Sequence, residues 1–405
     1  MNTNFSLTYS TEIKEPKLSF LMQAFFKMMT TFLSEYFNQV LIQFAEYYMN
    51  SEDKPFKCDK CGNTHNFTWK TKHGKLTKIV TILKIIKIHQ LQIKCKECDH
   101  KFYITRNLLG IEKRKVIPFE TIRKLGLIGA LTTFGISKKI LSIFGVQLNK
   151  MTVWRAVQKS AKEIEFNIDP EEEATGEADG TGVPTIGIKK RGSEIKVFIQ
   201  KKKSGGVRIA GLSIGKYDSE WEKLFAPLLD NLSTFKSFLL TTDGDTSIFK
   251  ALKGKIEVKL QRCLWHIPHQ LKWYLWKDKV KRKSDIWNSI MGKSYDIVNI
   301  HGLLEKDDAV IDKIIELKEK RLDELVDYCT ESNYKSCATY LTNAKSDMFT
   351  AVKNRLEGKT TSRVERVMKT INARIKVGKW SRRGALNVNK IRLAHYYNDY
   401  MSEIE

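Results

Sequence analysis

Two Cys-x-x-Cys pairs constrain this chain more than any other feature of its sequence. One pair is Cys58 and Cys61 and the other is Cys95 and Cys98, and each pair places two thiolates where one metal ion can take both. Two such pairs complete a tetrahedral four-cysteine site, the usual arrangement of structural zinc. We therefore expect Zn²⁺ in a zinc ribbon over residues 51–112, because a core this small needs a metal to fold.

The surroundings of the cysteines leave alternatives open. His65 and His100 can each replace a thiolate as a ligand, and unmetallated turns or a disulfide are the alternatives to a metal site. Residues 1–17 lack the pattern of a signal peptide, so we expect a reducing compartment, where paired cysteines bind metal. The most apolar stretch, residues 18–33, is interrupted by Lys27 and is too short to span a bilayer, so no membrane partner is expected.

The charge balance indicates a polyanionic partner. The 405 residues include 70 Lys and Arg against 46 Asp and Glu, so the formal net charge is +24. Such an excess is typical of proteins that bind nucleic acid, and a basic surface without a partner is the alternative. Residues 17–50 are rich in Phe, Met, Leu and Tyr at helical spacing, which predicts an N-terminal helical segment within residues 1–50 that packs in a core or a dimer.

A helix-turn-helix DNA-binding domain is predicted within residues 113–168. Phe134 to Ser137 is interpreted as a glycine stop and a serine cap, followed by a short helix over 138–144 and a second helix over 150–162. This pattern is used to place a helix in the major groove of double-stranded DNA, and an ordinary helical hairpin is the alternative. The side chains expected to face DNA include Thr152, Arg155, Gln158 and Lys159.

Residues 169–275 alternate strand-like and helix-like runs in an order that positions two aspartates. Strands are expected within 174–183 and at 195–200, 207–214, 238–242 and 256–260, with a kinked helix over 221–232 and a short one at 248–252. Three strands, a helix, a strand, a helix and a strand is the order of an RNase H-like core. In that fold Asp179 on the first strand lies beside Asp243 at the end of the fourth.

Paired carboxylates suit metal-dependent phosphodiester chemistry. Such reactions commonly use two Mg²⁺ (or Mn²⁺) ions, and carboxylates supply the oxygen ligands that these ions prefer. An Asp-Gly at a strand end is also a common turn, so either aspartate alone is weak evidence. Asp179 and Asp243 in the expected strand order make a stronger case.

The motifs in this half of the chain resemble a known family. Asp179-Gly-Thr, Thr242-Asp243-Gly and Cys263-Leu-Trp-His266, in this order, are similar to those of the Mutator-like group of DDE transposases. The resemblance covers the chain from Ala174 onward. It implies an all-helical insertion, placed here at residues 276–356, before a third catalytic carboxylate. Cys263 and His266 are expected to be structural, holding the strand end against the next helix.

The third carboxylate is expected within residues 357–405. Glu365 lies in an arginine-rich helix followed by Lys379-Trp380-Ser381, as the resemblance implies. Ser362 and Glu365 also have capping-box spacing, so Glu365 can instead close a helix start, and Glu357 is then the next choice. Arg363 and Arg366 belong to a basic cluster around Glu365 that can hold the DNA backbone or simply be solvated.

These features together predict a DNA transposase with a zinc ribbon, a helix-turn-helix domain, an α/β RNase H-like core and a helical insertion. The resemblance implies that it cuts element ends and joins the freed 3′-hydroxyl to target DNA. A homodimer or higher oligomer is expected, in the cytoplasm on the nucleoid of a prokaryote or in the nucleus of a eukaryote. Two alternatives stay open, which are a transposase-derived DNA-binding regulator without catalysis and a nuclease that cuts without joining.

Overall fold

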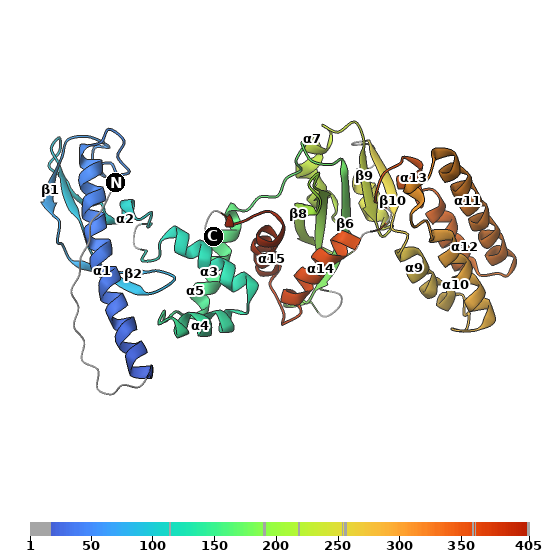
Figure 1. Ribbon diagram of the computed structural model, residues 1–405, viewed down its shortest axis with the longest axis horizontal. Coiled ribbons are helices and arrows are strands. Elements are labelled where there is room, and N and C mark those ends of the chain that lie inside the picture. Colours follow the sequence, from blue (N-terminus) through green and yellow to red (C-terminus); the bar gives the residue numbers. More distant parts are fainter. Residues whose placement is uncertain are drawn as a thin grey trace. The chain divides into compact units, whose positions relative to one another are not determined.

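The chain divides into two units between Ala161 and Lys162 (Figure 1). The computed structural model describes residues 18–112, 115–188, 192–217, 219–252, 254, 257–358, 360 and 362–402. Among these residues no helix has both the length and the apolar character needed to cross a membrane.

The first unit begins with one long helix, α1 (Leu18–Asn50). The C-terminal half of α1 packs on the ribbon, where Leu41 is buried. The Asn38 side chain accepts the backbone N–H of His89 at 2.7 Å and donates to the carbonyl of Lys87 at 3.4 Å. Helix α1 therefore satisfies backbone groups on β3 that would otherwise form an open sheet edge.

A small antiparallel sheet with the strand order β1-β4-β5 carries the second cysteine pair, since Cys95 ends β4 and Cys98 lies in the turn before β5, while the first pair precedes β1. A separate hairpin joins β2 to β3. These strands and the short helix after them are β1 (Phe67–Thr71), β2 (Leu76–Val80), β3 (Ile85–His89), β4 (Gln92–Cys95), β5 (Lys101–Tyr103) and α2 (Thr105–Leu108). The buried side chains of Ile88, Leu91 and Ile93 belong to the small core that they share with α1.

Three helices complete the first unit: α3 (Phe119–Leu131), α4 (Phe134–Ile143) and α5 (Lys150–Ser160). The expected glycine stop and serine cap before α4 are wrong. Helix α4 begins at Phe134, because the Thr133 side chain accepts the N–H of Ile136 at 3.2 Å, and Ser137 is buried inside the helix. Asn149 caps α5 by accepting the N–H of Met151 at 3.0 Å. The 3₁₀ helix η1 (Ala161–Glu163) spans the boundary between the first and the second unit.

A five-stranded sheet in the order β10-β9-β6-β7-β8 forms the centre of the second unit. Its strands are β6 (Thr175–Val183), β7 (Ser193–Lys201), β8 (Val207–Gly215), β9 (Phe238–Thr242) and β10 (Val258–Arg262). Neighbours among β6, β7 and β8 are antiparallel, whereas β9 runs parallel to β6 and β10 runs parallel to β9. The sheet is therefore mixed, with β6 at its centre.

Helices cover both faces of this sheet. On one face, Phe198 and Leu240 pack against Trp221 and Phe225. That face carries α6 (Glu222–Phe225), η2 (Ala226–Leu228), α7 (Leu229–Leu232) and α8 (Thr246–Leu252), and Pro227 stands at the 3₁₀ turn that interrupts the expected helix. The other face packs on α14 (Ser362–Ile375) and α15 (Arg382–Tyr397), and α14 lies against β6 (Figure 1).

Between β10 and α14 the chain forms a helical insertion with a core of its own. Its elements are α9 (His266–Lys277), α10 (Asp285–Val298), η3 (Leu303–Glu305), α11 (Asp308–Glu331), α12 (Lys335–Lys345) and α13 (Thr350–Lys353). The far end of the insertion is tied back to β10. Arg262 forms a buried bidentate ion pair with Asp347, in which the Nε–Oδ1 distance is 2.8 Å and the Nη2–Oδ2 distance is 3.1 Å. The Gln261 side chain donates to the carbonyl of Met348 at 2.6 Å.

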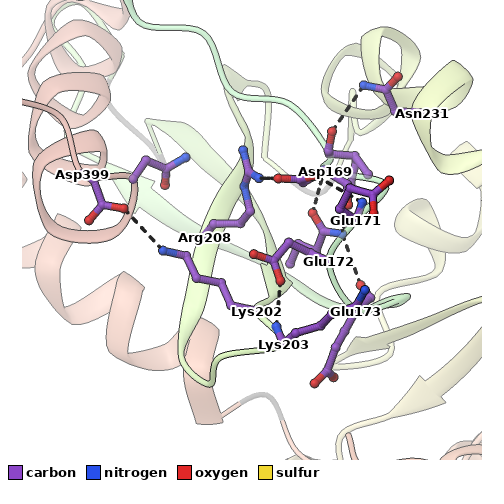
Figure 2. Close-up of polar contacts among 12 residues, drawn as sticks. Asp169, Glu171, Glu172, Glu173, Lys202, Lys203, Arg208, Asn231 and Asp399 are labelled. Carbon is purple, nitrogen blue, oxygen red and sulfur yellow. Dashed lines mark hydrogen bonds and ion pairs between the residues drawn. The ribbon is translucent and has the colours of Figure 1, made fainter.

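The acidic run at residues 169–173 is folded onto the β7–β8 hairpin. Asp169 forms an ion pair with Arg208, and Glu172 accepts the backbone N–H of Lys203 at 2.7 Å (Figure 2). The Gln200 side chain also accepts the N–H of Asp169 at 2.9 Å and donates to its carbonyl at 2.8 Å. The acidic run is thus held inside the second unit by cations and amides of the β7–β8 hairpin.

Candidate active site and metal centre

The four cysteine thiols converge on one point in the first unit. All four Sγ atoms lie within 4.8 Å of one another. The Sγ atoms of Cys58 and Cys98 are 3.5 Å apart, and those of Cys61 and Cys95 are 3.7 Å apart. Four sulfurs bonded tetrahedrally to one ion at ~2.3 Å are separated by ~3.8 Å. The cysteine cluster therefore has the donor set and the size that zinc requires.

Backbone N–H groups favour the thiolate form of Cys58 and Cys95, whose pKa values are lowered, whereas burial and the neighbouring thiols raise the pKa values of Cys61 and Cys98. Burial raises the pKa of the Cys95 thiol, but hydrogen bonds from the N–H groups of Cys98 and Glu97 more than offset this and lower its pKa. Because a metal binds the thiolate, such donors favour the ligand form of cysteine. Within the described part of the chain, neither His65 nor His100 belongs to the cluster.

Asp179 and Asp243 come together at one edge of the large sheet. Asp179 lies within β6, and Asp243 directly follows β9. The parallel ladder pairs Glu177 with Thr241, so two residues further along both strands Asp179 comes level with Asp243. Neighbouring strands lie ~4.8 Å apart, and side chains at matched positions point to the same face. Both carboxylates therefore project from the face that α14 covers.

The turn after β9 fixes the position of Asp243. The Oδ1 atom of Asp243 accepts the N–H of Asp245 at 3.0 Å. Gly244 has a φ of +96° and lies against the guanidinium of Arg262, so a side chain at this position would be strained and would collide with it. Asp245 in turn accepts the indole N–H of Trp221 at 3.1 Å. The Asp-Gly-Asp sequence is therefore held on both sides.

Helix α14 brings Glu365 to the same face. The apolar stripe of the helix, which includes Val364 and Ile371, is fully buried against the sheet. Glu365 lies on the flank of this stripe, with its Oε1 atom 3.4 Å from Nε2 of His266 at the start of α9. The negative charge of Glu365 also contributes to the raised pKa of Asp179. The side chains of three distant segments thus act on one another electrostatically.

The start of α14 is closed by Glu177 on β6. Its Oε2 atom accepts the backbone N–H of Arg363 at 3.1 Å and that of Val364 at 2.9 Å. The role that a capping box assigns to Glu365 is not seen among the described residues, where Glu365 faces His266 instead. The free N–H groups at the helix start are satisfied from the sheet, which also fixes α14 on β6.

Glu357 lies at a different place on the sheet. It is exposed and its Oε2 atom is 2.9 Å from Nζ of Lys201 at the end of β7. Asp179 pairs with Val197, four residues earlier on β7, which corresponds to ~13 Å along the strand. Glu357 therefore binds a lysine away from the level of the two aspartates.

Burial and mutual repulsion shift the titration of this group of acids. Burial raises the pKa of Asp179 to about 7, and the charges of Asp243 and Glu365 act in the same direction. Burial also raises the pKa of Asp243. Burial lowers the pKa of His266, but the hydrogen bond with Cys263 and the charges of the two aspartates raise that pKa above its ordinary value. A divalent cation among these acids would relieve their repulsion.

The carboxylates do not form a closed single-ion cluster. Among the described residues, only the four cysteines bring three or more ligand atoms within 4.8 Å of one another. Two ions that are ~3.5–4 Å apart are held from opposite sides, so their ligands spread further than those of one ion. Oxygen donors of this kind suit Mg²⁺ or Mn²⁺.

A cavity of ≈ 390 Å³ opens beside Glu365. Its lining includes the exposed cations Arg366 and Lys369, which lie on the same side of α14 as Glu365. Arg363 points elsewhere, with its guanidinium 4.0 Å from the carboxylate of Glu357. Of the predicted basic side chains, Arg366 is thus the one placed at the candidate site.

On α5 in the first unit, the four side chains expected at DNA differ in their surroundings. Arg155 is exposed, whereas Thr152, Gln158 and Lys159 are half-buried. Lys159 forms an ion pair with Glu112 and lies 5.4 Å from the centre of the Phe119 ring. Among these four side chains, Arg155 is therefore the one that is exposed to solvent.

Neither a protein-family model nor a curated protein matches the chain. Two parts of the site were not predicted from the sequence, namely the capping role of Glu177 and the approach of His266 to Glu365. The spacing of Glu177 and Asp179 is a usable signal for the first, because alternate residues of a strand share a face. No comparable local signal predicts the second.

Proposed function

We propose that the chain is a DNA transposase of the DDE type, in which Asp179, Asp243 and Glu365 hold two Mg²⁺ (or Mn²⁺) ions. The observation that carries this proposal is the placement of Asp179 level with Asp243, with Glu365 on the helix that covers them. The mixed strand order β10-β9-β6-β7-β8 supports an RNase H-like core. When bound, the ions would activate the attacking water or 3′-hydroxyl and stabilise the leaving oxygen.

The neighbours of these acids have positioning roles in this proposal. Glu177 fixes α14 on β6 and thereby sets where Glu365 lies. His266, hydrogen-bonded to Cys263, contacts the Glu365 carboxylate and ties the start of α9 to the site. Arg366 adds positive charge beside the cavity, where a DNA phosphate must enter.

In the first unit we propose a structural zinc ion held by Cys58, Cys61, Cys95 and Cys98, and a DNA contact through α5. Four protein ligands leave no open position for a substrate, so the ion would stabilise the ribbon. Of the four side chains expected to face DNA, Arg155 is the exposed one and is therefore available for a contact with double-stranded DNA. The net charge of +24 supports the DNA partner.

The test is a cleavage and joining assay on a supercoiled plasmid that carries the gene with its flanking DNA, with a second plasmid as target and Mg²⁺ or Mn²⁺ present. Asp179→Asn, Asp243→Asn and Glu365→Gln are each expected to lower cleavage by more than about 100-fold, because each removes a charge that the ions require. Glu357→Gln is the matched control, since it removes the same charge from an exposed site that binds Lys201. It is expected to keep activity.

Thermal unfolding without divalent cations separates a chemical defect from misfolding. Because the acids repel one another, each variant is expected to unfold at the wild-type temperature or above it. Full cleavage by Asp179→Asn or Asp243→Asn would overturn the two-metal mechanism, and full cleavage by Glu365→Gln would move the third ligand elsewhere. Cleavage without joining would identify a nuclease, and binding without cleavage by the wild type would identify a regulator.

A further inference from the structure

Helix α9 carries aromatic side chains on its solvent-facing side. Trp273 and Trp276, and Trp265 just before the helix, are 50%, 71% and 55% exposed. At ~100° per residue these positions fall on one side of the helix, and the apolar side chains that α9 buries fall on the other. We call this row the α9 stripe, and its members are Trp265, His269, Lys272, Trp273 and Trp276.

Three rings of the α9 stripe, those of Trp265, His269 and Trp273, make contacts that orient them. The ring centroids of Trp265 and His269 are 4.1 Å apart, with an interplanar angle of 36°. The Nζ atom of Lys277 lies 3.7 Å from the centroid of the Trp273 ring, a close cation–π contact. Rings that are held in this way lose less conformational freedom when a flat ligand binds them.

Positive charge continues beyond the end of α9. The segment after the helix carries exposed Lys279, Lys281, Arg282 and Lys283, and in the part of the chain that the structure describes none of them pairs with an acid. The acid that precedes them, Asp278, accepts the N–H groups of residues 336 and 337 at 3.0 Å and 2.8 Å and so caps α12. This distribution of charge attracts a polyanion.

The α9 stripe begins at the candidate active site. Trp265 lines the cavity of ≈ 390 Å³ together with Glu365, and it lines a second cavity of ≈ 430 Å³ together with His269. From Trp265 to Trp276 the helix advances ~17 Å at ~1.5 Å per residue. This distance equals about five stacked bases at ~3.4 Å each.

We propose that the α9 stripe binds a single-stranded stretch of DNA beside the phosphodiester bond that is cut, an inference that rests on the proposed function. The faces of exposed indoles stack on bases, and the neighbouring lysines contact phosphates. A DNA duplex offers no free base faces within its length, so the ligand is a separated strand. A protein partner fits less well, because lysine is depleted in the cores of protein interfaces.

The experiment measures binding of the full chain to a fluorescent oligothymidylate of about 12 nucleotides and to a duplex of the same length, without divalent cations. Trp273→Ala and Trp276→Ala are each expected to raise the Kd for the single strand roughly tenfold, and the double variant more, with a smaller effect on the duplex. Trp276→Phe should restore most of the affinity, because phenylalanine keeps a stacking face.

Tyr396→Ala is the matched control for these variants. Tyr396 on α15 is 52% exposed and lies 5.3 Å from the guanidinium of Arg392, so it is an equally open ring beside a cation. It lies outside the stripe, and its removal is expected to leave both Kd values unchanged. An equal loss of affinity for Tyr396→Ala would show that any exposed ring has this effect and would overturn the proposal.

Three further outcomes would overturn the proposal. The first is single-strand binding by the double variant that is unchanged from the wild type, and the second is an equal loss of affinity for duplex and single strand. The third is a change in the oligomeric state of the tryptophan variants, measured by light scattering. Because this assay needs neither metal nor cleavage, it fails independently of the proposed function. If cleavage depends on the carboxylates but the tryptophan variants bind the single strand like the wild type, only the proposed role of the α9 stripe is rejected. If the wild type does not cleave DNA but its single-strand binding depends on Trp273 and Trp276, only the proposed transposase function is rejected.

Discussion

Glu177 and Asp179 leave β6 on the same side of the sheet, but their surroundings differ. Glu177 is buried against the N–H groups at the start of α14, whereas Asp179 faces other carboxylates. The N-terminus of a helix favours a negative charge, and burial opposes it. Burial prevails here, since it raises the pKa of Glu177 to about 7.

This balance predicts that Glu177→Gln reduces the dependence of stability on pH. The folded-state pKa of about 7 lies above the ordinary value of 4.5, so the native protein binds the proton more tightly than the unfolded chain. Wild-type stability should therefore fall as the pH rises from about 4.5 to 7, by about 3 kcal/mol from this group at 1.36 kcal/mol per pH unit. Glutamine keeps an acceptor for the N–H groups and does not titrate.

Urea unfolding of the second unit at pH 5 and pH 8 in magnesium-free buffer measures this effect, with Glu171→Gln, an exposed acid, as the control. Asp179 titrates in the same range, so the comparison is best repeated in an Asp179→Asn background. A wild-type slope that persists in Glu177→Gln and disappears in Asp179→Asn would assign the titration to Asp179 alone.

At the residue scale, the sequence predicts the roles of residues that follow from local patterns along the chain. It misses the roles that depend on contacts between segments far apart in the sequence. Asp179 and Asp243 could be located because strand alternation and strand ends are local patterns. For Glu177, strand alternation predicts only that it shares a face with Asp179, and its capping role depends on partners on α14 that lie 186 and 187 positions away in the chain. The same holds for Lys159, whose predicted contact with DNA competes with an ion pair to Glu112.

Among the elements, the ribbon depends most on a single set of ligands. Cys58→Ser, or treatment with a zinc chelator, is expected to lower the zinc content from about one ion per chain and to unfold β1, β4 and β5. The second unit has its own sheet and helical core, so it should stay folded. Elemental analysis and hydrogen exchange over the ribbon measure the two effects.

His65→Ala is the control for the ribbon, because His65 is exposed and outside the cysteine cluster. It should retain the metal and the protection from exchange. Freshly prepared, unchelated wild-type protein without zinc would contradict the assignment, and so would a Cys58→Ser variant that keeps a full complement of zinc.

Element boundaries show where local rules compete. Thr133 and Ser137 are both acceptable helix caps, and sequence alone does not choose between them. Tertiary packing does, because Ser137 is fully buried inside α4 and its hydroxyl also donates to the carbonyl of Ile128 on α3 at 3.4 Å. The interruption of the helix at Pro227 can be predicted from the sequence alone, because a proline disturbs an α-helix in any tertiary environment.

For the molecule as a whole, the exposed half of α1 predicts self-association. Its large apolar side chains in solvent include Phe20, Leu21, Met22, Phe25 and Phe32. Contiguous apolar surface of this kind is typical of interaction sites, and a second copy of α1 offers a matching surface. Phe25→Lys with Phe32→Lys is expected to weaken the dimer by roughly tenfold or more, because buried aromatic side chains dominate such interfaces.

Sedimentation equilibrium measures this change, and Phe44→Lys is the control. Phe44 is 42% exposed, much like Phe25 at 45%, but it lies in the half of α1 that packs on the ribbon. It should leave the dimer intact. A wild-type chain that stays monomeric at micromolar concentration would contradict the prediction.

The helical insertion leaves the sheet after β10 and returns to the same strand. The N–H of Arg262 donates to the carbonyl of Asp347 at 2.7 Å, and the N–H of Ala351 donates to Gln261 Oε1 at 2.8 Å. With respect to the sheet, the insertion is equivalent to a loop, because the segment at its far end is hydrogen-bonded to the strand from which it leaves. The entropy of closing such a loop grows only with the logarithm of its length, about 0.6 kcal/mol for each doubling. Whole helices can therefore be gained or lost over evolutionary time with little effect on the fold that carries Asp243.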